Sequence, residues 1–109
     1  MHLDRAVPAL TRRRRGTRLA VLLTSELVTN AIRHQPGETV LLIVTATPGQ
    51  LRVDVHDTSR SLPVPAHAPP DAEAGRGLVL VASLSADWGY RRTAAGKAVY
   101  FTLASPEDP

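Results

Sequence analysis

The segment from Thr39 to Asp57 constrains the fold most, because it has the pattern of two strands joined by a tight turn. Residues 39–47 are rich in β-branched side chains, and Pro48-Gly49 is typical of a two-residue turn. From Gln50 to Asp57 apolar residues alternate with polar ones, which predicts a strand with one buried and one solvated face. A hairpin of this kind needs a second layer to cover its apolar face.

A helical pattern over residues 17–35 supplies the first candidate for that layer. Apolar side chains recur there every three or four positions, which is the spacing of one helix face. We expect the helix to begin at about Thr17, after an arginine run that Gly16 closes, and to end before Pro36-Gly37. The predicted apolar stripe comprises Leu19, Ala20, Leu23, Leu27, Val28, Ala31 and Ile32.

The second half of the chain shows the same order of elements. Residues 58–76 are proline-rich and lack periodicity, which predicts a long loop; loops of this kind are typically functional lids or disordered segments. A short apolar helix is expected over 77–86, and a second hairpin over 87–104 with its turn at 93–96. The whole order predicts an α+β fold, a two-layer sandwich with a mainly antiparallel sheet and helices on one face.

The length of 109 residues fits one domain. We divide it into a weakly patterned basic segment at 1–16, a folded domain at 17–104 and a tail at 105–109 that we expect to fray. No apolar run approaches the ~18 residues of a membrane span, and no signal peptide is recognisable. The chain has no cysteine, which excludes a disulfide framework and a thiolate metal site. We therefore expect a cytoplasmic protein without a membrane partner.

The net charge of +3 is a weak indicator of nucleic-acid binding, because it comes from one run of arginines at 12–15. Nucleic-acid-binding proteins usually spread basic residues along a face and interleave aromatic side chains for stacking. The aromatic residues here lie near the C-terminal end, and we assign Trp88 and Tyr90 to the core. We expect no direct nucleic-acid partner.

Three groups of residues could carry chemistry, and each also has a purely structural explanation. Glu26 and Asn30 lie one helical turn apart, with His34 continuing the row; they could hold a cation and move a proton, or form a solvated face. Asp57 ends a strand before the long loop, where it could accept a hydrogen bond from an exocyclic amine or form an Asx turn. Gly75-Arg76-Gly77 precedes a helix, where it could bind phosphate or simply end the loop.

Taken in order, four motifs closely resemble those of the GHKL ATPase superfamily, which includes gyrase B, sensor histidine kinases and a heat-shock chaperone. The motifs are SELVTNAIRH at 25–34, VDVHDTS at 53–59, GRGLVLV at 75–81 and GKAVYF at 96–101. The resemblance runs from about residue 19 to residue 103. It is closest to the anti-sigma-factor serine/threonine kinases and their actinobacterial relatives, and it implies ATP and Mg²⁺ as cofactors.

The resemblance also implies roles for individual residues. In such proteins the glutamate matching Glu26 acts as general base, the asparagine matching Asn30 binds Mg²⁺, and the aspartate matching Asp57 reads the adenine amine. The glycine motif closes over the phosphates, and the loop before it forms the ATP lid. Phosphoryl transfer needs positioning, a cation and a residue that orients the nucleophile, and these groups supply each. The predicted nucleotide-binding residues are Asn30, His34, Asp57, Ser59, Gly75, Arg76, Gly77 and Leu78.

Three departures from the family pattern bear on function. Ser59 and Ser61 stand where the motif after Asp57 has glycines, and an added Cβ there narrows the approach to adenine. Lys97 and Ala98 replace a threonine often found at the start of the last strand. Relatives usually carry a strand and a helix before the helix with the glutamate, whereas only sixteen weakly patterned residues precede it here. Because this N-terminal helix of the relatives commonly helps them dimerise, a homodimer is left open.

The resemblance implies an anti-sigma-factor-like serine/threonine protein kinase. Such a kinase phosphorylates a serine of an anti-sigma-factor antagonist and regulates transcription through a sigma factor. The alternative is a non-catalytic, degenerate GHKL module that regulates by holding a protein partner. A nucleic-acid regulator acting through the arginines at 12–15 is the least favoured hypothesis.

Overall fold

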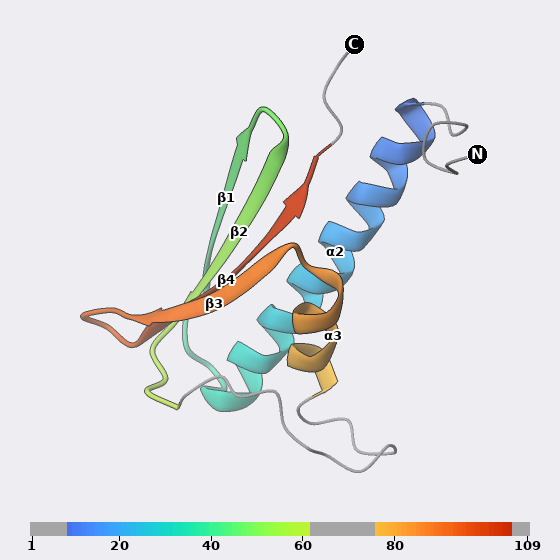
Figure 1. Cartoon of the computed structure of the whole chain (residues 1–109). Helices are drawn as coiled ribbons and strands as arrows, with labels where there is room; N and C mark the ends of the chain where they lie inside the picture. The colour runs from blue at the N-terminus through green and yellow to red at the C-terminus, as the bar shows by residue number, and fades with distance from the viewer. Residues whose placement is uncertain (1–8, 62–75, 106–109) are drawn as a thin grey trace.

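An antiparallel sheet covered on one face by two helices makes up the part of the chain that the computed structural model describes, residues 9–61 and 76–105 (Figure 1). The four strands lie in the order β1-β2-β4-β3. This arrangement confirms the predicted α+β two-layer fold. The elements are α2 (Ala9–His34), β1 (Leu41–Thr47), β2 (Gln50–Asp57), α3 (Arg76–Leu84), β3 (Asp87–Arg92) and β4 (Lys97–Ala104).

Both predicted hairpins form, and each turn has a local cause. Gly49 has a φ of 80°, which suits the third position of a type II turn, while Pro48 fixes the preceding φ. In the second turn Thr93 N–H donates to the carbonyl of Gly96 at 3.0 Å, and Gly96 N–H donates to Thr93 Oγ1 at 3.0 Å. These turns set the register of the two outer strand pairs, β1 with β2 and β3 with β4.

The core lies between the helices and the two central strands, β2 and β4. Val53 and Val55 of β2 pair with Phe101 and Val99 of β4, and all four side chains are buried. Because alternate residues of a strand share a face, these pairs form one continuous apolar surface. The helices cover that surface with Leu23, Leu27, Ala31, Leu78 and Val81.

Helix α2 begins at Ala9, so the predicted start at Thr17 was wrong. The hydrophobic pattern gave no signal before Thr17, because residues 9–16 include a run of arginines. Arginine, alanine and leucine have high helix propensity, and a helix already formed by its packed half extends through them at little cost. Gly16 therefore lies inside the helix rather than at its start. Neither helix within the described ranges is long and apolar enough to cross a lipid bilayer.

A polar cluster lies on the sheet face that points away from the helices. Arg52 donates two hydrogen bonds to Asp54, from Nε to Oδ2 at 3.0 Å and from Nη2 to Oδ1 at 3.2 Å. The guanidinium also lies 4.0 Å from the centroid of the Tyr100 ring, a cation–π contact. The hydrogen bond to Asp54 raises the pKa of Arg52 above its ordinary value, and burial opposes that rise. The cluster thus covers part of the outer side of β2 and β4.

The two edge strands are more exposed than the sequence pattern suggests. Every residue of β1 is exposed, because β1 lies at the edge of the sheet and α2 packs over β2 and β4. On the opposite edge strand, β3, Trp88 packs against the core as predicted. Tyr90 is 43% exposed, so its assignment to the core was wrong.

Gly16 in α2 and Gly96 before β4 differ in the space around them, and their replacement by alanine tests the packing at both places. A Cβ on Gly16 would meet no atom within 4 Å, so Gly16→Ala should stabilise the protein by about 0.5–1 kcal/mol through its helix propensity. A Cβ on Gly96 would overlap the Asp57 carbonyl oxygen and lie 2.6 Å from Thr58 Cα. Gly96→Ala should therefore destabilise the protein by about 1–3 kcal/mol. Urea unfolding measures both, and a Gly96→Ala variant as stable as the wild type would contradict the packing described here.

Candidate functional site

Helix α2 presents Glu26, Asn30 and His34 on one side, because residues four apart in a helix lie on the same face. Asn30 and His34 line a small hollow that Asp57 of β2 also lines. Glu26 and Asn30 are half-buried, while His34 is exposed at the end of the helix. The structure thus places Asn30 and His34 of the predicted row beside the end of β2, which the spacing of these residues alone did not establish.

Helix α3 brings Gly77 against the same row. A Cβ on Gly77 would lie 2.7 Å from Glu26 Oε2 and 3.5 Å from Asn30 Nδ2. The absence of a side chain therefore lets the first turn of α3 approach the carboxylate and the amide closely. The first N–H groups of a helix have no partner within the helix and can bind an anion. Leu78, the next residue, is buried and lines the hollow.

Asp57 lies at the end of β2 and is 5% exposed. Its Oδ1 accepts a hydrogen bond from the backbone N–H of Ser59 at 2.8 Å, which is the Asx turn considered above. Ser59 Oγ in turn accepts a hydrogen bond from the N–H of Ser61 at 3.0 Å. The turn fixes the orientation of the carboxylate, and the carboxylate still borders the hollow.

The sequence pattern did not reveal the partner of Asp57, which is Lys97. Lys97 Nζ lies 3.0 Å from Asp57 Oδ1, and the two side chains are 4% and 3% exposed. The β2–β4 register places these residues opposite each other. The alternation of β4 could have revealed the inward orientation, because Lys97 has the same parity as the buried Val99 and Phe101.

Gly75 and residues 62–75 of the expected lid lie outside the described residues, and Arg76 is placed only as the first residue of α3. In the described ranges no three histidine, cysteine, aspartate or glutamate side chains are close enough to hold a metal ion. Near Gly77 lie the carboxylate of Glu26 and the amide of Asn30, with Oε2 and Nδ2 the polar atoms closest to its Cβ position. The amide also carries an oxygen, which fits Mg²⁺, because this ion usually takes one or two protein ligands and completes its shell with phosphate and water.

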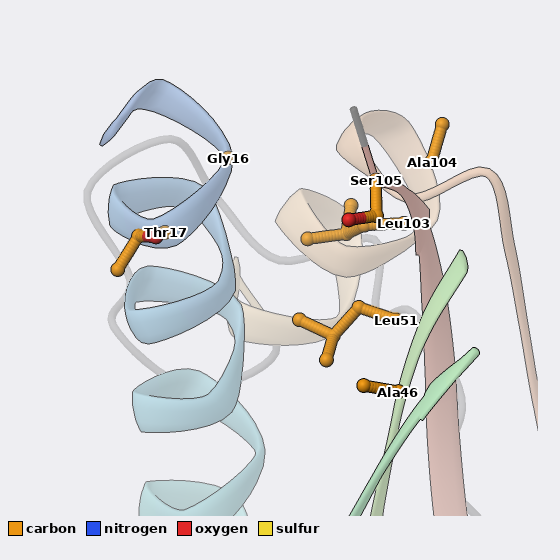
Figure 2. Close-up of a pocket in the computed structure, with 7 residues that line it drawn as sticks. All are labelled: Gly16, Thr17, Ala46, Leu51, Leu103, Ala104 and Ser105. Carbon is orange, nitrogen blue, oxygen red and sulfur yellow. The ribbon is translucent and has the colours of Figure 1, made fainter. Parts of the chain in front are cut away.

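The hollow beside Asp57 and Lys97 is very small. Its volume is about 10 Å³, close to the roughly 10–15 Å³ needed for one water molecule. A larger hollow of about 290 Å³ lies at the opposite end of β4, next to Gly16, Leu51 and Leu103 (Figure 2). The described residues that line it carry no charge. The candidate site and this larger hollow are therefore separate features.

Comparison with known proteins shows which family the chain belongs to. The sequence profile of the histidine kinase-like ATPase domain matches residues 9–103, most of the chain. The chain belongs to the histidine kinase-like ATPase family. The resemblance to GHKL ATPases, stated on the motifs alone, is thereby confirmed.

A solved structure agrees with this assignment. This chain is similar to the histidine kinase domain of a blue-light activated histidine kinase from Erythrobacter litoralis, with 31% sequence identity and a TM-score of 0.55. The match covers 82% of this chain and 43% of that chain, so this chain spans less than half of the solved one. None of the curated proteins compared with the chain matches it. The comparisons support ATP binding in general.

The buried pair in this ATPase domain predicts how stability depends on its two partners. Asp57→Ala leaves the Lys97 ammonium without its counter-charge and should destabilise the protein by about 3–5 kcal/mol. Asp57→Ala combined with Lys97→Met removes both charges and should recover most of that loss. Urea unfolding of the wild type and both variants measures the effect. A double variant no more stable than Asp57→Ala would show that the ion pair is not the cause.

Proposed function

We propose that the chain is an ATP-binding, anti-sigma-factor-like serine/threonine protein kinase. The observation that carries this proposal is the approach of Gly77 to Glu26 and Asn30, with Asp57 lining the hollow that Asn30 also lines. One end of this arrangement suits phosphate and a cation, because it combines oxygen ligands with the first turn of a helix. The other end suits a hydrogen-bond donor, because it holds a carboxylate.

The end with Asp57 would bind the nucleotide base. An ionised carboxylate only accepts hydrogen bonds, so it selects a donor such as the exocyclic amine of adenine. The backbone N–H of Ser59 holds Asp57 Oδ1 at 2.8 Å, which fixes the carboxylate before a ligand arrives. A fixed acceptor lowers the entropic cost of binding.

Phosphoryl transfer would take place at the end with Glu26. Asn30 would hold Mg²⁺ through its amide oxygen, and the bound ion offsets the negative charge of the transferred group. Glu26 would accept the proton of a serine hydroxyl as the serine oxygen bonds to the γ-phosphorus and the bond from that phosphorus to ADP breaks. The backbone at Gly77 would orient the phosphate oxygens.

The resemblance of the motifs to anti-sigma-factor kinases supports the choice of partner. The acceptor serine would belong to an anti-sigma-factor antagonist. Unphosphorylated antagonist frees the sigma factor, and phosphorylation lets the kinase hold the sigma factor again. In this role the protein acts in the cytoplasm and regulates transcription without direct contact with nucleic acid.

A non-catalytic module that holds a protein partner is the second candidate. Three observations favour it: the hollow of about 10 Å³, the contact of Lys97 with Asp57, and the burial of Ser59 at a position where relatives have glycine. Each reduces the space or the hydrogen-bonding capacity available to a base. The core around Phe101 would keep the fold without a nucleotide.

Glu26→Gln separates catalysis from binding. The amide keeps the size of the side chain but cannot accept the serine proton, so phosphoryl transfer should fall at least about 100-fold while Mg·ATP affinity stays nearly unchanged. Transfer from γ-labelled ATP to an antagonist protein and calorimetric titration measure the two quantities. The exposed Glu38 provides the control, since Glu38→Gln should change neither. Transfer at the wild-type rate by Glu26→Gln would refute the assigned role, and a folded wild type without ATP binding would favour the non-catalytic module.

A further inference from the structure

Lys97 is the only lysine of the chain, and its ammonium group is almost completely buried. Lysine is rarely buried unless it is paired, and here the pair is made with Asp57, whose side chain is equally inaccessible. Arginine supplies the other side chains that are positively charged at pH 7 when histidine is neutral. A flexible four-carbon stem that ends in a compact ammonium can enter a space that a planar guanidinium cannot.

The backbone leaves Lys97 little choice of position. Asp57 and Lys97 are direct partners in the β2–β4 ladder, and Gly96 packs so closely on the carbonyl of Asp57 that a side chain there would overlap it. Lys97 lines the small hollow together with apolar residues such as Leu27, Val55 and Val99 and with the polar Asn30 and His34. In such surroundings the ammonium needs a counter-charge, and Asp57 supplies it.

The hydrogen bonds of Asp57 show what this contact prevents. A carboxylate oxygen has two lone pairs, and Oδ1 already accepts bonds from the Ser59 N–H at 2.8 Å and from Lys97 Nζ at 3.0 Å. An exocyclic amine is also an N–H donor, and Lys97 leaves it only the second carboxylate oxygen, Oδ2. The space of about 10 Å³ beside the pair is too small for a purine ring.

We infer that Lys97 is a latch on the base end of the pocket: its ammonium holds Oδ1 of Asp57, its side chain takes up room beside that carboxylate, and a nucleotide binds only by displacing this side chain. This inference rests on the proposed function, because it takes Asp57 as the residue that reads the base. Lys97 acts through Asp57 and is therefore a positioning residue. Displacement costs part of the binding energy, so the latch lowers affinity for the nucleotide.

The single lysine makes the latch directly observable in the wild-type protein. An amine-reactive ester followed by peptide mass spectrometry reports the exposure of Lys97 Nζ apart from the terminal amine. We expect slow labelling of the nucleotide-free protein, and faster labelling at saturating adenosine, which carries the base edge but no phosphate. Protection of Lys97 by bound adenosine, or no change on binding, would overturn the latch.

Affinity measurements supply the second arm. Lys97→Thr and Lys97→Met remove the ammonium, and calorimetric titration should show adenosine and Mg·ATP binding roughly tenfold to hundredfold more tightly than to the wild type. Arg92→Thr is the matched control, because Arg92 is the cross-strand partner of Lys97 on β3 and is exposed; it should leave affinity unchanged. The labelling of the wild type remains decisive if a Lys97 variant fails to fold.

The outcomes separate this inference from the function on which it rests. If the wild type binds Mg·ATP and the folded Lys97→Thr variant binds it equally or more weakly, the latch is refuted and the proposed function stands. If no folded variant binds adenosine or Mg·ATP, the proposed function fails and the latch fails with it.

Discussion

The antiparallel ladder between β2 and β4 is the interaction on which the rest of the structure depends. It joins segments that lie 40 residues apart at Asp57 and Lys97. Its inward pairs, Val53 with Phe101 and Val55 with Val99, form the surface on which both helices pack. Without it each hairpin would be a two-stranded unit of marginal stability. The ladder therefore makes one sheet, and one core, from two local structures.

The same ladder gives the two ends of the sheet different properties. At the end with Asp57 the backbone after β2 lies so close to Gly96 that a side chain there would overlap the Asp57 carbonyl oxygen. The buried ion pair of Asp57 and Lys97 lies at the same end. At the other end β4 runs out beside the first half of α2 and leaves an open, uncharged hollow (Figure 2). The residues that match the family motifs lie at the end with Asp57, although the hollow at the other end is larger. A buried charge pair contributes little net stability, which is consistent with a role in binding.

Most of the fold could be predicted because it is encoded locally. The bounds of β2, β3 and β4 agree with the predictions, since alternation and turn residues define them without reference to the rest of the chain. The early start of α2 could not be predicted from hydrophobic periodicity, because propensity rather than an apolar stripe extends that helix. Tyr90 shows a related limit, since its exposure depends on the position of β3 at the sheet edge.

The candidate site could be predicted only in part from the sequence. Spacing put Glu26 and Asn30 on one helix face, but their approach to Gly77 depends on how α3 packs on α2. The motif resemblance assigned Glu26, Asn30 and the glycine motif to one predicted nucleotide site, which helical periodicity could not do. The Asp57–Lys97 pair depends on the register between strands far apart in sequence, so neither local pattern nor motif order revealed it.

We propose that Mg·ATP binds where α2, the end of β2 and the start of α3 meet. The most informative measurement is an NMR titration of ¹⁵N-labelled wild-type protein with Mg·ATP. We expect saturable shifts of the backbone amides of Asn30, Asp57 and Gly77, with Leu51 and Leu103 at the other end of the sheet nearly unchanged. Shifts confined to Leu51 and Leu103, or a folded spectrum that does not respond to Mg·ATP, would show that this site does not bind the nucleotide.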